Sequence, residues 1–168
     1  MNQAAIRSPH APDSLEIRPA NSAELPEIVR LLADDPLGAQ RERFENPLPP
    51  AYTEAFGAIA RQHGNQVLVA VEVGPGGNDR VVGCLQLTFI PGLARLGTTR
   101  AQIDSVRVDT RHRGQGIGEA LTRTAIDLAR EAGCGLVQLT TDKSRRDAHR
   151  FYERLGFIAS HEGMKLTL

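Results

Sequence analysis

Hydrophobic positions recur with a helical period in four segments of the chain. After residue 20, one apolar face is formed by Leu25, Ile28, Val29 and Leu32. Asn21 or Ser22 can cap this helix, because a short polar side chain accepts a hydrogen bond from a free N–H at a helix start. The same period predicts helices over residues 52–62, from 117 to a stop at Gly133, and over 148–155.

Other segments alternate with a period of two or form short apolar runs, which predicts strands. They cover residues 15–18, 66–73, 80–90, 102–108, 135–141, 157–160 and 164–168. Residues 74–79 (Gly-Pro-Gly-Gly-Asn-Asp) are strong turn residues, so 66–73 and 80–90 form a predicted hairpin. A strand-helix-strand crossover should place 135–141, as a buried strand, parallel to 102–108. The last two strands form a second predicted hairpin.

The central strand, residues 102–108, is followed directly by a glycine-rich turn. Strict alternation puts Asp104, Val106 and Val108 on one side of it, opposite Ile103, Ser105 and Arg107. Three glycines then follow at Gly114, Gly116 and Gly118. Glycine permits positive φ and lets a ligand approach the backbone, and a helix start presents free N–H groups. The unit therefore predicts an anion site, most naturally for phosphate.

The spacing of the glycines argues against two common phosphate motifs. A Walker loop needs Lys and then Ser or Thr after its last glycine, but Glu119 and Ala120 follow Gly118. The dinucleotide fingerprint is G-x-G-x-x-G, whereas this chain has G-x-G-x-G.

Two motifs resemble the GNAT superfamily, the acetyl-CoA-dependent N-acyltransferases. Residues 113–118 (Arg-Gly-Gln-Gly-Ile-Gly) resemble its R-x-x-G-x-G pyrophosphate loop, and residues 148–157 resemble its A-x-x-F-Y-x-x-x-G-F helix. The opening Ile-Arg-Pro-Ala at 17–20 is similar to its first strand. The resemblance implies a single GNAT-like domain over 15–168 with an α/β (α+β) fold, namely a mixed central sheet of six to seven strands flanked by about four helices. Residues 1–14 are expected to be a flexible leader.

The resemblance also implies which residues bind acetyl-CoA. The backbone of Val106, Arg107 and Val108 would pair with the pantetheine arm. The pyrophosphate would be wrapped by Arg113, Gly114, Gln115, Gly116, Ile117, Gly118 and Glu119. Arg145 stands where many members have an asparagine that contacts the cofactor, and this departure opens the alternative that basic residues there bind a phosphate or form a solvated surface.

Tyr152 and Asp104 are the candidate catalytic residues. Tyr152 matches the family tyrosine that protonates the departing thiolate, although an aromatic residue on an apolar helix face is also typical of a core. Asp104 lies where many members carry an acidic residue and is the candidate general base; substrate anchoring and ion pairing are its alternatives. His161 and Glu162 are weaker candidates for the base.

Composition is that of one globular domain of 168 residues. Twenty basic and twenty acidic residues cancel, so no charge excess indicates nucleic-acid or anionic-membrane binding. Cys84 and Cys134 lack metal-ligand spacing and are predicted to be core thiols rather than reactive or disulfide-bonded cysteines. No apolar run has the length of a membrane span and no signal pattern is present, which favours the cytoplasm. No metal is expected.

The expected function is transfer of an acetyl group from acetyl-CoA to a small-molecule amine. Acidic residues in 34–45 could favour a cationic acceptor, or they could belong to a solvated loop. The alternatives are a protein lysine or N-terminal acetyltransferase, a non-catalytic acyl-CoA-binding regulatory domain, and a nucleotide-binding protein. A homodimer is compatible with the resemblance.

Overall fold

The computed structural model describes residues 9–11, 14–34 and 38–168, and most of the predicted leader lies outside these residues. One sheet runs through the molecule in the order β1-β2-β3-β4-β5. Its strands are β1 (Leu15–Pro19), β2 (Asn65–Glu72), β3 (Arg80–Ile90), β4 (Arg100–Val108) and β5 (Leu136–Leu139). Neighbouring strands are antiparallel except β5, which is parallel to β4 as the crossover predicted.

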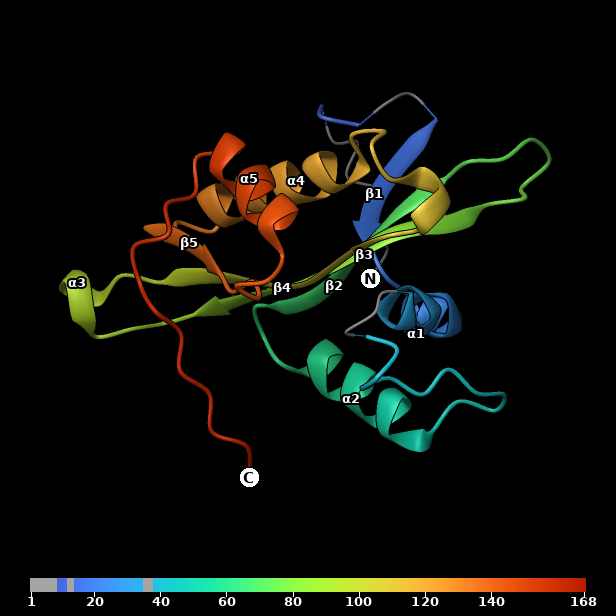
Figure 1. Ribbon diagram of the computed structural model, residues 1–168, viewed down its shortest axis with the longest axis horizontal. Helices are drawn as coiled ribbons and strands as arrows, with labels where there is room; N and C mark the ends of the chain where they lie inside the picture. Colours follow the sequence, from blue (N-terminus) through green and yellow to red (C-terminus); the bar gives the residue numbers. More distant parts are fainter. Residues whose placement is uncertain (1–8, 12–13, 35–37) are drawn as a thin grey trace.

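Helices cover both faces of the sheet (Figure 1). On one face lie α4 (Ile117–Glu131) and α5 (Arg146–Arg154), and on the other lie α1 (Leu25–Ala33) and α2 (Pro50–Arg61). A single turn, α3 (Ala94–Gly97), joins β3 to β4, and two 3₁₀ turns are η1 (Ser22–Glu24) and η2 (Thr110–His112). η1 leads directly into α1. Asn21, one of the two predicted capping residues, caps the start of η1, and its side chain accepts from the Ala23 N–H.

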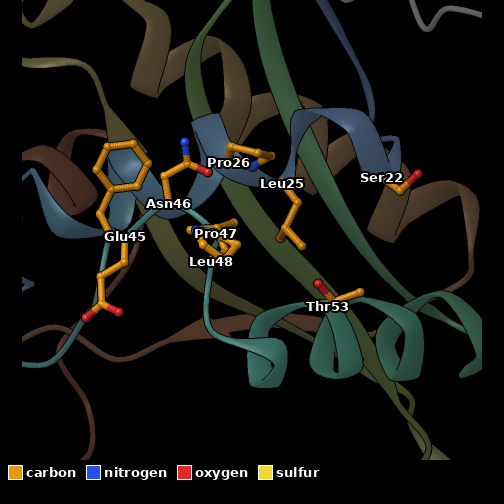
Figure 2. A pocket seen from close by; sticks show the side chains of 9 residues that line it. Ser22, Leu25, Pro26, Glu45, Asn46, Pro47, Leu48 and Thr53 are labelled. Carbon is orange, nitrogen blue, oxygen red and sulfur yellow. The ribbon is translucent and has the colours of Figure 1, made fainter.

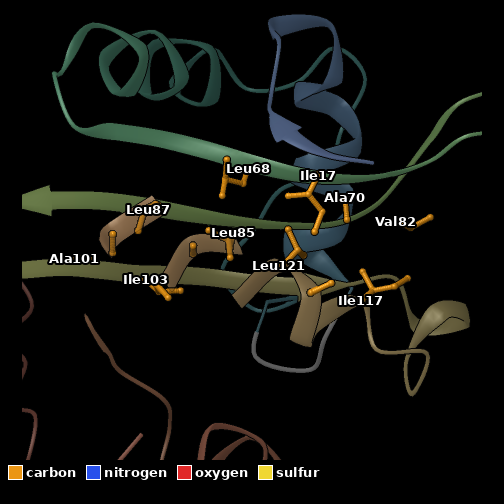
Figure 3. Packing of buried hydrophobic residues seen from close by; sticks show 13 residues of the cluster. Ile17, Leu68, Ala70, Val82, Leu85, Leu87, Ala101, Ile103, Ile117 and Leu121 are labelled. Atoms are coloured by element: carbon orange, nitrogen blue, oxygen red, sulfur yellow. The ribbon is translucent and has the colours of Figure 1, made fainter. Parts of the chain in front are cut away.

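Two apolar layers hold the helices to the sheet. The layer under α4 is shown in Figure 3 and joins Leu121 of α4 to the strand residues Leu85 and Ile103. The opposite layer contains Val69 and Cys84 of the sheet and packs against α1 and Phe56 of α2. Full burial of each large aliphatic side chain contributes about 1.5–3 kcal/mol, so α4 and α1 are fixed by packing. Among the described helices, none is long and apolar enough to span a membrane.

A β-bulge at Ser105 changes which residues of β4 share a face. Ser105 has φ of 54°, and the pairing register of β3 with β4 shifts between Cys84 and Gln86. Val106 and Val108 consequently pack in the same layer as Ile103. The prediction that Asp104 shares a face with these valines was therefore wrong, because the extra residue of a bulge resets strand alternation.

The C-terminal hairpin predicted from alternation is also absent. Within the described part of the chain the sheet has five strands, not six or seven, and residues 157–168 contain no strand. Met164, Leu166 and Leu168 are almost fully exposed, so their alternation is not matched by a sheet face that could bury them. Nor is β5 a buried strand: it is an edge strand of four half-buried residues.

Candidate active site

The sheet opens where β4 and β5 separate. The last paired residues are Ile103 and Leu139, after which β5 ends while β4 continues to Val108. On its other side this part of β4 stays paired, with Arg107 opposite Cys84 and Val108 opposite Gly83. The β5-facing edge beyond Ile103 is thus not used by the sheet, and an extended ligand can hydrogen-bond to such an edge.

The glycine turn lies at the end of this edge. Gly114 and Gly116 have φ of 77° and 80°, as predicted for positions that need glycine, and Gly116 is the residue that precedes α4. No described atom lies within 4 Å of a Cβ placed on either one, so the turn is open on its outer side. Ala120 donates to the Gly116 carbonyl, which leaves the preceding N–H groups of the first turn of α4 to bind an anion.

Gly118 has a different role from the other two glycines. A Cβ at Gly118 would stand 3.5 Å from Val108 and 3.7 Å from the ring of Phe151. Gly118 of α4 therefore lies close to both Val108 of β4 and Phe151 of α5. Gln115 and Glu119 bond within the turn and the helix, Gln115 to the Arg111 carbonyl at 3.3 Å and Glu119 to Arg123 at 2.8 Å.

Asp109 anchors the turn, a role that motif comparison did not indicate. The residue is 2% exposed, and its carboxylate contacts Arg30 at 3.0 Å, Arg111 at 3.3 Å and His112 at 3.3 Å. Burial alone would raise the pKa of Asp109, but hydrogen bonds from His112 and Arg30 outweigh burial and lower it. Its sequence signal is faint: an acidic residue at a strand end, followed after one residue by Arg111, His112 and Arg113.

Side chains from the end of α1 hold the same turn. The Asp34 carboxylate accepts from the Thr110 hydroxyl at 2.7 Å, and Arg113 donates to the Asp34 carbonyl at 3.0 Å and to the Val108 carbonyl at 3.2 Å. Arg113, predicted to wrap the pyrophosphate, therefore also binds the protein itself, as does Arg111 through Asp109.

Tyr152 borders the opening from α5. Its ring makes edge-to-face contacts with Phe151, at 5.0 Å between centroids, and with Phe157, at 5.8 Å. Burial raises the pKa of Tyr152, and the charges of Arg145 and Arg107 oppose that rise. The structure thus brings together three predicted residues: Arg107 of β4, Arg145 before α5, and Tyr152 of α5. A tyrosine with a raised pKa stays protonated at neutral pH.

Asp104 stands at the parting of the two strands, on the face opposite Ile103. It is half-buried, and among the described residues its polar partner is Gln102, whose amide donates to Oδ1 at 3.1 Å. The weaker candidates lie in the exposed C-terminal segment, where Glu162 pairs with Lys143 at 2.7 Å and His161 contacts the Ser160 hydroxyl at 2.8 Å.

Three acidic residues of segment 34–45 have partners within the protein, and Asp35 lies outside the described residues. Glu42 accepts from the Tyr52 hydroxyl at 2.8 Å, and Glu45 pairs with Arg43 at 2.9 Å. Together with the Asp34 contacts, these bonds favour a structural use of the segment over attraction of a cationic acceptor.

A pocket of about 680 Å³ lies apart from the predicted site residues (Figure 2). It is formed between η1, the start of α1, the loop before α2, and α2 itself, and is lined by Ser22, Leu25, Pro26, Phe44, Glu45, Asn46, Pro47, Leu48 and Thr53. It contains no candidate acid or base from the opening.

The two thiols are poor nucleophiles. Burial raises the pKa of Cys84 to about 12, with the charges of Arg107 and Arg30 acting against it, and burial also raises the pKa of Cys134. Neither is in a disulfide. In the described ranges, no group of three or more His, Cys, Asp or Glu side chains could hold a metal ion.

Comparisons with known proteins agree with this geometry. A crystal structure from Bacillus halodurans C-125, described as that of a transcriptional regulator, is 49% identical, with 92% of this chain and 99% of that chain covered and a TM-score of 0.86. Trypanosoma brucei brucei glucosamine 6-phosphate N-acetyltransferase is 38% identical over 53% of this chain and 58% of its own length. Salmonella typhimurium aminoalkylphosphonate N-acetyltransferase is 53% identical over 29% and 32%.

The chain thus spans only about a third to three fifths of the length of these two curated relatives. The family match is broader. Residues 27–157, which include the glycine turn, the opening and Tyr152, match the family described as Acetyltransferase (GNAT) family. The chain belongs to the GNAT acetyltransferase family.

Proposed function

We propose that this protein is an N-acetyltransferase that moves an acetyl group from acetyl-CoA to the primary amine of a small molecule, by direct attack while both are bound. One observation carries the proposal: β4 and β5 part after Ile103 and Leu139, with the open glycine turn at one end of the exposed edge and Tyr152 beside it. Transfer from a thioester needs a site for the phosphates of the cofactor, a strand edge for its extended arm and a proton donor for the leaving thiolate.

The residues present fit coenzyme A. Positive-φ glycines leave room for a pyrophosphate against the N–H groups that begin α4, and the turn itself is already held by Asp109. The free edge of Val106 to Val108 would bind the pantetheine arm. Acetyl-CoA supplies the activated thioester when it is bound.

Tyr152 holds the proton for the leaving thiol. Its raised pKa keeps the phenol protonated, and a half-buried donor is partly shielded from water. Phe151 and Phe157 fix the ring by edge contacts, so the hydroxyl has a defined position.

Asp104 receives the proton of the acceptor ammonium. An alkylamine with a pKa of about 10.4 is deprotonated at pH 7 at a cost of roughly 4 kcal/mol, so a nearby carboxylate acting directly or through water is required. The Gln102 amide, which donates to Oδ1, orients this carboxylate. A small-molecule acceptor is supported by the names of two relatives, which specify glucosamine 6-phosphate and an aminoalkylphosphonate.

The first test is calorimetric titration of the folded protein with acetyl-CoA, beside ATP and NAD. We expect saturable binding of acetyl-CoA alone. Absence of binding at millimolar acetyl-CoA would reject the proposal and leave the glycine turn as an anion site of another kind. Amines are then screened by thiol release, with Asp104→Asn expected to lower turnover while acetyl-CoA binding is retained.

A second candidate is a regulatory domain that binds acyl-CoA without turnover. It is favoured by the likeness to the Bacillus halodurans protein, which is described as a transcriptional regulator and is 49% identical to this chain. The two functions differ in one measurement. A regulatory domain would bind acetyl-CoA and release no thiol with any amine, and Tyr152→Phe would change nothing measurable.

A further inference from the structure

A group of polar side chains crosses the sheet on the face that carries α1 and α2. One residue from each of four strands lies in register, with Asn65 opposite Thr88, Thr88 opposite Gln102, and Gln102 opposite Gln138. The neighbouring pair is Gln86 and Asp104. We call these six half-buried residues the amide row: Asn65, Gln86, Thr88, Gln102, Asp104 and Gln138.

The amide row interrupts an otherwise apolar sheet. Leu85, Leu87 and Ile103 alternate with its members and belong to the layer under α4, so the row faces the other way. Farther along that same face, Val69 and Cys84 are buried against α1 and α2. Polar side chains are costly to bury, and a sheet covered only by helices would favour aliphatic residues here.

Hydrogen bonds within the row form two chains, which end at Asp104 and at Asn65. Gln138 donates to the Gln102 oxygen at 2.7 Å, and Gln102 donates to Asp104 at 3.1 Å. On the other side, Thr88 and Gln86 donate to the Asn65 oxygen at 2.9 and 3.0 Å. Gln102 also donates to the Ile103 carbonyl at 3.3 Å, and Asn65 donates to Gln62 at 3.2 Å. Because a carboxamide has two N–H donors and an oxygen with two lone pairs, binding capacity remains chiefly on Gln86, Gln138 and the Gln102 oxygen.

The row reaches the opening at its charged member. Asp104 is the residue of β4 that follows the last β4–β5 pair, so Gln102 and Gln138 lie next to the point where the strands part. A ligand bound through its amine at Asp104 would extend its remaining atoms over carboxamide and hydroxyl groups. Such groups both donate and accept, which suits alcohols and amides, and an alkyl chain would leave them without hydrogen bonds.

We propose that the amide row is the acceptor surface and that it selects a primary amine bearing several hydroxyl or amide groups over a plain alkylamine. This inference rests on the proposed acetyltransferase function. Asp104 takes the ammonium group, Gln102 fixes Asp104, and Gln138 fixes Gln102. Both glutamines bind the polar substituents of the acceptor.

The test compares two amines with the same six-carbon chain, 1-amino-1-deoxysorbitol and n-hexylamine. Thiol release is measured with saturating acetyl-CoA, and kcat/KM is expressed per unprotonated amine. We expect the hydroxylated amine to be favoured at least about tenfold, since a site that hydrogen-bonds hydroxyl groups discriminates against analogues that lack them. Equal or better use of hexylamine would overturn the inference.

Two variants assign the preference to the row. In Gln138→Leu, we expect KM for the hydroxylated amine to rise about threefold to tenfold with little change for hexylamine. Gln102→Leu also removes the hydrogen bond to Asp104, so it should impair both amines, and the hydroxylated amine more. Gln66→Leu is the matched control, because Gln66 pairs with Leu87 and so lies on the α4 face of the same sheet. Circular dichroism and acetyl-CoA titration check folding, and Gln138, on the edge strand, provides the variant if Gln102→Leu unfolds.

Failure of this inference is distinguishable from failure of the proposed function. If the wild-type protein does not bind acetyl-CoA, both fall. If it binds acetyl-CoA but acetylates hexylamine as well as the hydroxylated amine, or acetylates hexylamine and no hydroxylated amine, only the assignment of the amide row is rejected. An unchanged preference in both leucine variants rejects it too.

Discussion

The two helices that border the opening differ in how firmly the protein holds them. Seven residues of α4 are buried, and the turn before it is tied to α1 and the sheet through Asp109, Asp34 and Arg113. In α5 no residue is fully buried, and the segment that follows is extended with exposed apolar side chains. The α4 side of the site, which we call the firm wall, is therefore part of the hydrophobic core. The α5 side, the other wall, packs only on the surface of that core.

The difference fits the two ligands of the proposed reaction. Coenzyme A presents the same pyrophosphate at every turnover, so a rigid turn with its N–H groups already placed loses no ordering free energy on binding. In the proposed reaction the leaving thiolate lies next to α5, where Tyr152 is fixed mainly by aromatic contacts, and the acceptor lies on the opposite face of the sheet. A weakly packed wall can move as substrates enter and leave.

The largest effect is expected from removing the anchor of the firm wall. Asp109→Ala should lower the free energy of unfolding by about 3–5 kcal/mol, because it leaves Arg30 and its neighbours without their buried carboxylate. Urea denaturation measures the loss. Asp127→Ala, which breaks partly exposed ion pairs with Arg130 and His10, is the control and should cost no more than about 1 kcal/mol. Equal losses in the two variants would contradict the anchoring role.

Tyr152→Phe tests the other wall and should act on turnover alone. Loss of a positioned proton donor lowers kcat by about a hundredfold or more, while the remaining ring keeps its contacts with Phe151 and Phe157. Steady-state kinetics with acetyl-CoA titration separates the two effects. A parallel loss of acetyl-CoA binding would mean that Tyr152 is a structural residue of α5 and not a proton donor.

Gly116→Ala should weaken acetyl-CoA binding by the glycine turn or destabilise the fold. An alanine at φ of 80° is strained by about 1–2 kcal/mol. If the strain is present in the unliganded protein, the free energy of unfolding should fall by that amount. If the strain arises only on binding, Kd for acetyl-CoA should rise roughly tenfold. Calorimetry and thermal denaturation measure both. Gly163→Ala is the matched control, since Gly163 lacks positive φ and has open space around it. It should behave as the wild type.

The lowered pKa of Asp109 predicts a contribution to stability that acid removes. Because the pKa is lower in the folded state, the contribution is fully present above the unfolded pKa of about 3.9 and is lost as pH falls through the folded value. Between pH 5 and 3, the stability of Asp109→Asn should fall less steeply than that of the wild type, by at most about 1.4 kcal/mol per pH unit. Identical slopes would show that Asp109 has an ordinary pKa.

Contiguous features were predictable from sequence, and features assembled from separate strands were not. The glycine turn, the helix stop at Gly133 and the crossover to β5 are local, because a few consecutive residues determine their backbone. The bulge at Ser105 has no glycine or proline to indicate it, so the faces of β4 were assigned wrongly. Asp109 and the amide row depend on partners 21 to 79 residues away, which periodicity cannot reveal.

The C-terminal segment gives the smallest expected effect and the sharpest contrast with α4. Its apolar residues Met164, Leu166 and Leu168 are 97%, 86% and 112% exposed, so deleting residues 164–168 should change the free energy of unfolding of the monomer by less than about 0.5 kcal/mol. Alternating apolar residues without a covering surface are also what a second copy of the chain could bury, as in the homodimer with which the family resemblance is compatible. Analytical sedimentation of the full chain and of the deletion variant shows whether the segment is a surface tail of a monomer or part of a dimer contact. If both proteins are monomers of equal stability, the segment contributes to neither folding nor association. If stability depends on protein concentration and this dependence disappears on deletion, the dimer contact lies in residues 164–168.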